Sequence, residues 1–150
     1  MVENGRILVV DDEDSIRKVL KTILEEKGYR VDTAENGKEA INKSKQGAYN
    51  LALIDVRLPD IEGTELLKAM ENTTPNMVKV IVTGYPSLQN AITAVNNGAD
   101  AYILKPFKVE KVLHTIEVHL RRQQSEREYS EERVAEFIAT RVKEIEETIR

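Results

Sequence analysis

One stretch near the middle of the chain constrains the fold more than any other. Leu51–Ile54 is a run of four apolar residues that leads directly into Asp55, and Pro59 and Gly63 follow it. A short apolar run between turn-forming residues predicts a β-strand that is buried on both faces. A carboxylate is costly to bury inside such a strand, so we expect Asp55 at its polar carboxyl end. In an open parallel sheet, this is the edge where ligands bind.

Apolar runs like this one recur along the chain, and the segments between them have the apolar spacing of helices. Strands that alternate with helices predict an α/β fold, with a doubly wound parallel sheet covered by helices on both faces. One strand alternates apolar and polar residues, which places it nearer an edge of the sheet. The predicted strands cover residues 6–10, 29–34, 51–54, 78–82 and 101–104.

Cap and turn residues set the expected limits of the first three helices. Asp14 or Ser15 is expected to cap the first helix, and Gly28 to end it. The second helix starts at Asn36-Gly37 and ends by Gly47. The third covers residues 64–70, and residues 72–76, with a proline inside, form a loop.

The last two helices are predicted from their first turns and their apolar spacing. Pro86 and Ser87 open the fourth helix, because proline suits a first turn. Its inward-facing residues are expected to be Ala91, Ile92 and Val95. The fifth helix begins near Lys108, and the side chains expected to pack on the sheet are Val109, Val112, Leu113, Ile116 and Leu120.

Chemically active side chains follow four of the predicted strands. Asp11 and Asp12, Asp55, Thr83 and Lys105 stand at successive strand ends. Because the carboxyl ends of parallel strands meet at one edge of the sheet, we expect these residues to form one pocket. Crowded carboxylates repel one another unless a cation lies between them, and Mg²⁺ prefers such oxygen ligands. The lysine supplies a point charge suited to a phosphoryl group.

Together these residues resemble the receiver domain of two-component response regulators, the CheY-like family. The resemblance covers roughly residues 5–122. It implies a flavodoxin-like sheet with strand order 2-1-3-4-5, followed here by a C-terminal helical extension. The motifs that carry the resemblance are Asp11-Asp12, Asp55, Pro59, Gly63, Thr83 and Lys105-Pro106.

The resemblance also implies a role for each residue of the acidic site. Asp55 would be the phosphoacceptor, and a phosphohistidine on a sensor histidine kinase would be the donor. Asp12 and Asp55 would bind Mg²⁺ directly, and Asp11 would help through a water molecule. The backbone carbonyl of Arg57 would supply a further ligand.

The remaining implied roles concern switching. Thr83 would bond a phosphoryl oxygen, and Lys105 would pair with it. Tyr102 occupies the aromatic switch position, and the bond between Lys105 and Pro106 is expected to be cis. Such a domain acts as a switch that catalyses only its own phosphotransfer and dephosphorylation, so we expect no separate enzyme activity.

Three further residues near the site bear on the resemblance. One departs from the usual family pattern, and two occupy positions that affect dephosphorylation. Gly84 stands where the family most often has alanine, which leaves more room and a more mobile loop. Arg57 and Tyr85 flank the site at positions that tune dephosphorylation in the family. Tyr85 either covers the pocket and restricts water or simply faces solvent.

Composition limits the other functions available to the chain. The sequence has 150 residues, a net charge of -4 and no cysteine, which excludes disulfides and thiolate chemistry. The negative charge argues against direct nucleic-acid binding. No apolar run is long enough to cross a membrane and nothing resembles a signal peptide, so a soluble cytoplasmic protein is expected. The only histidines, His114 and His119, lie in one helix and do not suggest a metal site.

The sequence argues against three alternatives to a phosphorylated receiver. An aspartate-nucleophile, metal-dependent phosphohydrolase usually has a second aspartate two residues after the first, where this chain has Arg57. A nucleotide or flavin binder would have a glycine-rich first loop in place of residues 11–14, which are all acidic. A pseudo-receiver that works without phosphorylation would lack part of the residue set.

The end of the chain lies outside the resemblance. We expect a receiver domain over residues 1–122 and a helical extension over 123–150. Its apolar stripe favours a homodimer through the tail, as in a coiled coil, over a helix folded back on the receiver. The chain is either a single-receiver regulator or the front of a longer protein that acts on a downstream output protein or domain. The stripe consists of Val134, Ile138, Val142, Ile145 and Ile149.

Overall fold

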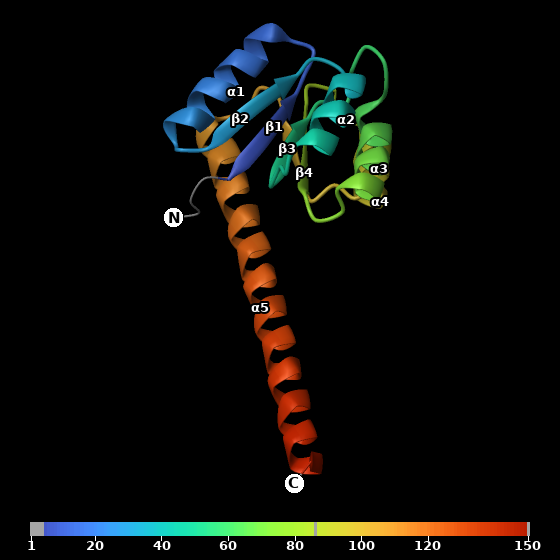
Figure 1. Cartoon of the computed structure of the whole chain (residues 1–150). Helices are drawn as coiled ribbons and strands as arrows, with labels where there is room; N and C mark the ends of the chain where they lie inside the picture. The colour runs from blue at the N-terminus through green and yellow to red at the C-terminus, as the bar shows by residue number, and fades with distance from the viewer. Residues whose placement is uncertain (1–4, 86, 150) are drawn as a thin grey trace. The chain divides into compact units, whose positions relative to one another are not determined.

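The computed structural model describes residues 5–85 and 87–149, and it contains one five-stranded parallel sheet. The strands lie in the order β2-β1-β3-β4-β5, which confirms the predicted fold class. Figure 1 labels the first four of them. The strand with alternating apolar and polar residues, β2, lies at an edge of the sheet, as predicted. The strands are β1 Arg6–Val10, β2 Arg30–Ala34, β3 Leu51–Ile54, β4 Val78–Thr83 and β5 Ala101–Leu104.

Helices cover both faces of the sheet, and each face has its own apolar core. The side chains of Ile7 and Val9 lie in one core, with residues of α1 and the first part of α5. Leu8 and Val10 point to the other core, with residues of α2, α3 and α4. This alternation is the two-residue period of a strand buried on both sides. The helices are α1 Asp14–Glu26, α2 Gly37–Gln46, α3 Gly63–Thr73, α4 Leu88–Asn96 and α5 Val109–Ile149.

The chain divides into two compact units, Met1–Leu120 and Arg121–Arg150. The first contains the sheet and its helices. The second is the C-terminal part of α5, and the apolar side chains along it are exposed. The polar stretch at residues 121–128 is part of this helix, which is continuous from Val109 to Ile149. The domain limits of 1–122 and 123–150 stay a prediction.

Several helix limits differ from the predictions. Neither Asp14 nor Ser15 caps α1, because Glu13 is the N-cap residue and its side chain makes no capping hydrogen bond. Helix α3 continues to Thr73, so the first part of the predicted loop at residues 72–76 is helical. Asn36 and Ser87 do cap α2 and α4 through their side chains, and Pro86 lies outside the described residues.

The predicted inward face of α4 is wrong. Ala94 is the fully buried residue of this helix, whereas Ile92 and Val95 are exposed and Ala91 is only partly buried. The small alanine allows the helix to pack closely against the core formed with α2 and α3. In α5, Val109 is also 38% exposed, although Val112, Ile116 and Leu120 pack on the sheet as predicted, and Leu113 lies partly buried against them.

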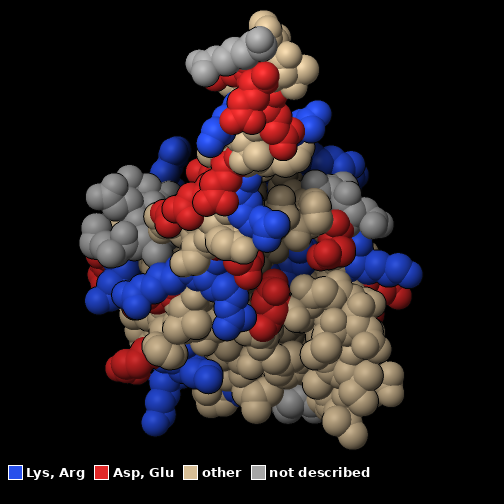
Figure 2. All heavy atoms as spheres, turned by 90° about the horizontal axis from the view of Figure 1, so that it is seen from below, with Lys and Arg blue, Asp and Glu red and all other residues tan. Residues whose placement is uncertain are grey.

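The surface carries charges of both signs. Basic and acidic side chains are interspersed over the face shown in Figure 2. No helix in the described part of the chain is both long and apolar enough to cross a membrane. The cytoplasmic location and the absence of direct nucleic-acid binding stay predictions.

Lys79 is an unexpected buried cation near the start of β4. Its side chain is only 1% exposed, and its ammonium group donates to the Glu71 carboxylate at 3.0 Å. It also donates to the backbone oxygens of Thr74 at 3.1 Å and Met77 at 2.9 Å. One side chain thus satisfies acceptors at the C-terminal end of α3 and in the loop that leads to β4.

We expect Lys79→Met to lower the free energy of unfolding by about 2–4 kcal/mol, because two carbonyls and a carboxylate lose their buried donor. Urea unfolding would measure the change. Lys68→Met is the matched control, since Lys68 is an exposed lysine of α3 and its loss should cost less than about 0.5 kcal/mol. Equal effects of the two substitutions would contradict the structural role of Lys79.

Candidate functional site

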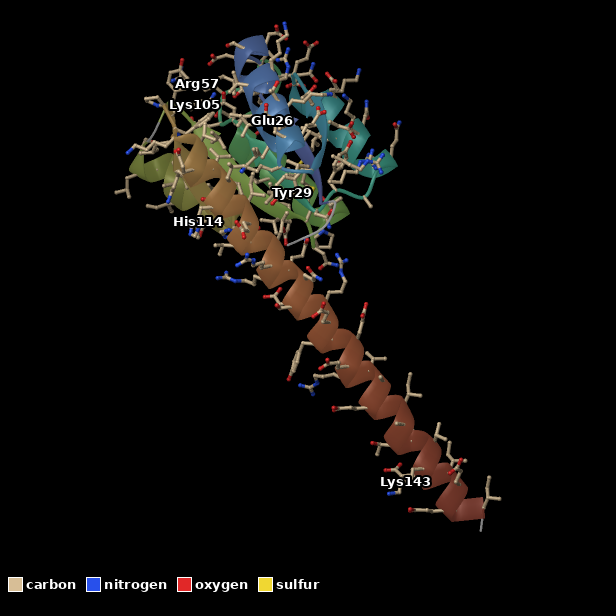
Figure 3. The ribbon with its side chains drawn as sticks, turned by 90° about the vertical axis from the view of Figure 1, so that its left-hand side faces the viewer. Glu26, Tyr29, Arg57, Lys105, His114 and Lys143 are labelled. Carbon is tan, nitrogen blue, oxygen red and sulfur yellow. The ribbon has the colours of Figure 1, made fainter. Side chains whose placement is uncertain are left out.

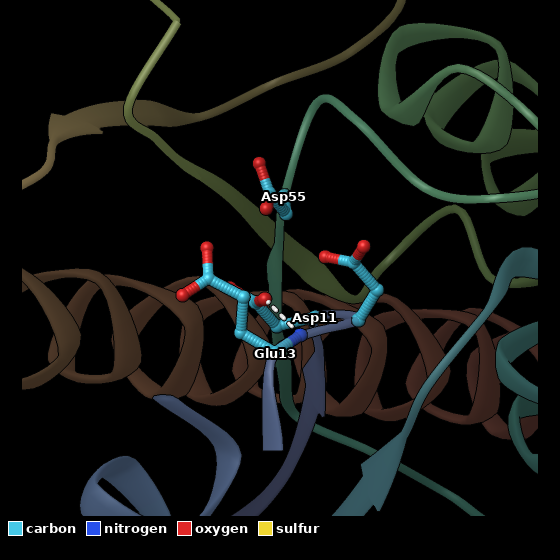
Figure 4. Close-up of side chains that lie close together, drawn as sticks. Asp11, Glu13 and Asp55 are labelled. Atoms are coloured by element: carbon cyan, nitrogen blue, oxygen red, sulfur yellow. Dashed lines mark hydrogen bonds between the residues drawn. The ribbon is translucent and has the colours of Figure 1, made fainter. Parts of the chain in front are cut away.

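The structure gathers the predicted site residues at the carboxyl edge of the sheet. Asp11 directly follows β1, Asp55 follows β3, Thr83 ends β4 and Lys105 follows β5. Figure 4 shows the side chains of Asp11, Glu13 and Asp55 beside these strand ends. Asp55 is only 4% exposed and Thr83 is fully buried. Residues far apart in the sequence therefore share one buried pocket.

Lys105 is the basic centre of this pocket. Its ammonium nitrogen lies 2.6 Å from Asp11 Oδ2 and 3.2 Å from Asp55 Oδ2. Burial alone lowers the pKa of Lys105, but the hydrogen bond and charge of Asp11, together with Asp55, raise it overall. Lys105 therefore stays protonated and bridges the two carboxylates. It lies at the same end of the receiver unit as Arg57 (Figure 3).

The pKa of the Asp55 carboxyl is also raised, which for an acid favours the neutral form. Burial raises its pKa, and the charge of Asp11 raises it further, although Lys105 and the backbone N–H of Arg57 act in the other direction. The net shift is upward. The ionised form of Asp55 is therefore disfavoured in this pocket, and a bound cation would stabilise it.

Four carboxylates could hold such a cation. Ligand atoms of Asp11, Asp12, Glu13 and Asp55 all lie within 4.8 Å of one another. An all-oxygen set with exposed members at one side suits Mg²⁺, which retains water molecules. The acidic groups in this part of the chain therefore fit a magnesium ion.

Glu13 was not among the predicted site residues. Its backbone N–H donates to Asp11 Oδ1 at 2.9 Å (Figure 4), and its carboxylate lies 3.9 Å from the Lys105 ammonium. The run of acids at residues 11–14 was visible in the sequence. Which of them turns toward Asp55 depends on the backbone turn after β1, and the sequence pattern does not specify it.

A stacked pair lies beside the pocket. The guanidinium carbon of Arg57 is 3.8 Å from the centroid of the Tyr85 ring, a cation–π contact. The Tyr85 backbone N–H donates to the Thr83 hydroxyl oxygen at 3.0 Å. The stack joins the loop after β3 to the loop after β4. Tyr85 therefore does not simply face solvent, although its ring remains half exposed.

Two glycines shape the pocket in different ways. Gly63 is required, because a Cβ there would overlap the backbone oxygen of Asp55. Its N–H donates to the Val56 oxygen at 2.6 Å, which closes the loop after Asp55. Gly84 is not required by space, because a Cβ there would lie 3.7 Å from Lys105 Cβ, an ordinary contact.

Tyr102, the predicted switch residue, lies on β5 and packs against the core that contains α4. Its ring is partly buried, and its hydroxyl group is buried without a hydrogen-bond partner among the described residues. Burial also raises the pKa of Tyr102. The peptide bond between Lys105 and Pro106 is cis, as expected.

A family model of the response regulator receiver domain matches residues 7–117. The chain belongs to this family. Receiver domains are signalling switches of two-component systems rather than enzymes in the ordinary sense. The match ends shortly before the boundary between the two compact units.

Two curated relatives of this receiver are transcriptional regulatory proteins. It is 37% identical over 120 residues to YkoG of Bacillus subtilis, an uncharacterized transcriptional regulatory protein, and covers 53% of that protein. It is 36% identical over 114 residues to the transcriptional regulatory protein ZraR of Klebsiella oxytoca, of which it covers 26%. These matches use 80% and 76% of the present chain. The receiver thus spans about half or less of the length of these relatives.

Solved receiver structures agree with the fold. A CheY-like receiver domain protein from Methanospirillum hungatei matches with a TM-score of 0.81 and 44% identity, over 83% of this chain and 99% of the other. The response regulator TrrA from Thermotoga maritima, solved in complex with Mg²⁺ and BeF, matches with a TM-score of 0.71 and 35% identity. That match covers 77% of this chain and 98% of TrrA.

The pKa shifts predict how two aspartates affect stability. Because the pKa of Asp55 is raised on folding, its favourable contribution is present below its unfolded pKa and is lost as pH rises through the folded value. At pH 7 without Mg²⁺, Asp55→Asn should therefore raise the melting temperature of the receiver. Calorimetry across a pH series would measure it, and the difference from the parent should shrink at acidic pH.

Asp32→Asn is the matched control, with the opposite sign. The Tyr49 hydroxyl donates to Asp32 at 2.6 Å and Arg6 pairs with it at 3.0 Å, so the pKa of Asp32 is lowered. This stabilisation is present above the unfolded pKa of Asp32 and is lost as pH falls through the folded value. The substitution should lower the melting temperature at pH 7. The same sign for both variants would refute the electrostatic description of the pocket.

Proposed function

We propose that this receiver is switched by transfer of a phosphoryl group from a phosphohistidine of a sensor histidine kinase to Asp55. The observation that carries the proposal is the environment of the Asp55 carboxylate. It is buried at the carboxyl edge of the sheet, hydrogen-bonded to Lys105 and surrounded by further carboxylates. Asp11 shares these features, but its two oxygens already accept from the Glu13 N–H at 2.9 Å and from Lys105 at 2.6 Å. The Asp55 oxygens accept from the Arg57 N–H and from Lys105 at the longer distances of 3.4 and 3.2 Å, so Asp55 is the less tightly held nucleophile.

The reaction is a nucleophilic displacement at phosphorus. A carboxylate oxygen of Asp55 forms the new P–O bond while the P–N bond to the donor imidazole breaks, and the imidazole nitrogen keeps that electron pair. Lys105 faces the same carboxylate and neutralises charge on the phosphoryl oxygens. Later attack by water releases phosphate and restores the Asp55 carboxylate, which resets the switch.

Asp12 and Asp55 would bind Mg²⁺ directly in this proposal, Asp11 through water, and Arg57 through its backbone carbonyl. The clustered carboxylates support this assignment, and Glu13 is an additional candidate. When bound, the ion supplies positive charge and orients the phosphoryl oxygens. The related regulator TrrA was solved in complex with Mg²⁺ and BeF, which supports a magnesium ion at this site.

Thr83 and Tyr102 are assigned to the conformational response. The Thr83 hydroxyl oxygen accepts the Tyr85 N–H, which leaves its own proton to be donated to a phosphoryl oxygen. Movement of Thr83 toward Asp55 would change the space beside α4, against which Tyr102 packs. The buried Tyr102 hydroxyl lacks a hydrogen-bond partner among the described residues. A rearrangement that supplied such a partner would therefore be favoured.

The downstream partner is proposed from the relatives. The matched relatives are transcriptional regulators of which this receiver covers about half or a quarter, so an output domain or a separate output protein would receive the signal. We assign residues 1–122 to the receiver and 123–150 to a helical extension that leads toward that output.

In the presence of Mg²⁺ and acetyl phosphate or a cognate kinase, the chain should gain one base-labile phosphoryl group. Asp55→Asn should abolish labelling, because the nucleophilic oxygen is lost. Intact-protein mass spectrometry would measure the gain in mass. Asp32→Asn should label like the parent, since Asp32 lies on β2 and pairs with Arg6 and Tyr49 outside the pocket. Undiminished labelling of Asp55→Asn would refute the proposed function.

The second unit supports a homodimer. Its stripe residues are 48–80% exposed and are spaced by three or four along the helix, so they share one face. An isolated helix of this length is marginal in water, and a second copy of the same stripe would bury it. All members of the stripe are β-branched, namely Val134, Ile138, Val142, Ile145 and Ile149.

Light scattering should give a dimer mass for the full chain and a monomer mass for a truncation that ends at Arg122. Ile145→Glu should produce monomers in the full chain, because it places a charge within the stripe. Thr140→Glu is the control on the opposite side of the helix and should remain dimeric. A monomeric parent at micromolar concentration would rule out dimerisation through the tail.

A further inference from the structure

The loop that follows Asp55 is attached to a helix far away in the sequence. Asp60 lies in this loop, and one of its carboxylate oxygens accepts the backbone N–H of Gly37 at 2.8 Å. The other accepts the N–H of Lys38 at 2.9 Å. Gly37 and Lys38 are the first residues of α2. A single side chain thus joins the Asp55 loop to the start of α2 by two hydrogen bonds.

These bonds complete the capping of α2. The first turn of a helix has N–H groups without acceptors inside the helix. The Asn36 side chain accepts the N–H of Glu39 at 2.8 Å, and Asp60 accepts the two that precede it. Both N–H bonds lower the pKa of Asp60, so its carboxylate stays ionised at neutral pH and faces the positive end of the helix dipole.

The contact between the loop and the helix is also close. A Cβ at Gly37 would overlap Ile61 Cγ2, the side chain next to Asp60. Glycine at the first position of α2 therefore lets the loop approach near enough for both Asp60 hydrogen bonds. The Asn36-Gly37 pair, visible in the sequence as a helix start, has this second role.

The base of the same loop is closed on itself. Arg57 and Glu62 form an antiparallel bridge, and the Gly63 N–H donates to the Val56 oxygen at 2.6 Å. The loop between them is thereby fixed at its base by its own backbone and at its tip by α2. A displacement of α2 relative to β3 would be transmitted through Asp60 to the backbone around Arg57.

We infer that Asp60 is a positioning residue that holds the Asp55 loop in the geometry needed for cation binding and couples that geometry to the N-terminus of α2. The inference rests on the proposed function, because the bound ion and the phosphoryl group give the geometry its use. Asp60 acts through the loop backbone and is itself exposed. Coupling of this kind is reciprocal, so Mg²⁺ binding must also alter the environment of the Gly37 and Lys38 amides.

The first test measures Mg²⁺ affinity by isothermal titration calorimetry on the full chain. Asp60→Ala should weaken binding about tenfold, the lower end of the range for residues that orient metal ligands. Asp60→Asn keeps one acceptor oxygen and the shape of the side chain, so its loss should be smaller. Asp60→Asn is also the milder substitution, so it can be measured in place of Asp60→Ala if that variant does not fold.

A matched control separates positioning from simple loss of charge. Asp14→Asn also removes an exposed carboxylate, two residues after Asp12, but leaves the Asp55 loop unchanged. A loss caused only by charge would appear in Asp14→Asn and would fade in concentrated salt. A loss caused by positioning should be specific to the Asp60 variants and should persist in salt.

The second test is a nitrogen–proton NMR titration with Mg²⁺. In the parent, the Gly37 and Lys38 amide signals should shift as the ion binds, and in Asp60→Ala this response should disappear while the Asp55 region still responds. Equal Mg²⁺ affinity in parent and Asp60→Ala, or unchanged responses at Gly37 and Lys38, would overturn the inference. Failure of the parent to bind Mg²⁺ would instead refute the proposed function.

Discussion

The bridge from Lys105 to Asp11 and Asp55 is the interaction on which the site depends. Its atoms come from the ends of β5, β1 and β3, so it exists only when the sheet is formed in the order β2-β1-β3-β4-β5. The bridge balances only part of the negative charge in the pocket, because two further carboxylates, Asp12 and Glu13, lie within reach of the same point. The fold thus holds acids together at a cost, shown by the raised pKa of Asp55, and a cation or a phosphoryl group can relieve it. Under the proposed function, a ligand that neutralises this charge shifts the conformational equilibrium only as far as it binds one conformation more tightly than the other.

The sequence was sufficient to predict the sheet and to place Asp11, Asp55 and Lys105 at neighbouring strand ends, but it did not indicate Glu13. Buried runs such as Leu51–Ile54 differ clearly from the alternating β2 strand, and polar residues stood at each expected strand end. The errors occurred where side-chain direction, rather than periodicity, decides the outcome. Helix α4 contains both alanines and larger apolar residues, and the structure buries the small Ala94 and exposes Ile92 and Val95. Apolar spacing alone cannot distinguish a face that packs closely from one that carries larger side chains.

Contacts between loops were beyond prediction for a related reason. The Arg57 stack on Tyr85, the Asp60 bonds to α2 and the approach of Glu13 to Lys105 join residues that are distant in sequence or that depend on one turn. Each residue was visible, but no periodic pattern links the partners. The buried Lys79 is similar, because two of its three acceptors are backbone oxygens that any sequence would provide, and the third, Glu71, lies eight residues away on α3.

The Asp55 loop contacts two other parts of the receiver. On one side, Asp60 joins the loop to the start of α2. On the other, Arg57 stacks on Tyr85, next to Thr83, and the Asn97 side chain at the end of α4 donates to the Thr64 oxygen at the start of α3 at 2.8 Å. The buried strands between these contacts leave little freedom for gradual deformation. Under the proposed function, we expect a change at Asp55 to move these loops between discrete arrangements, with α2 and α4 as the helices that respond.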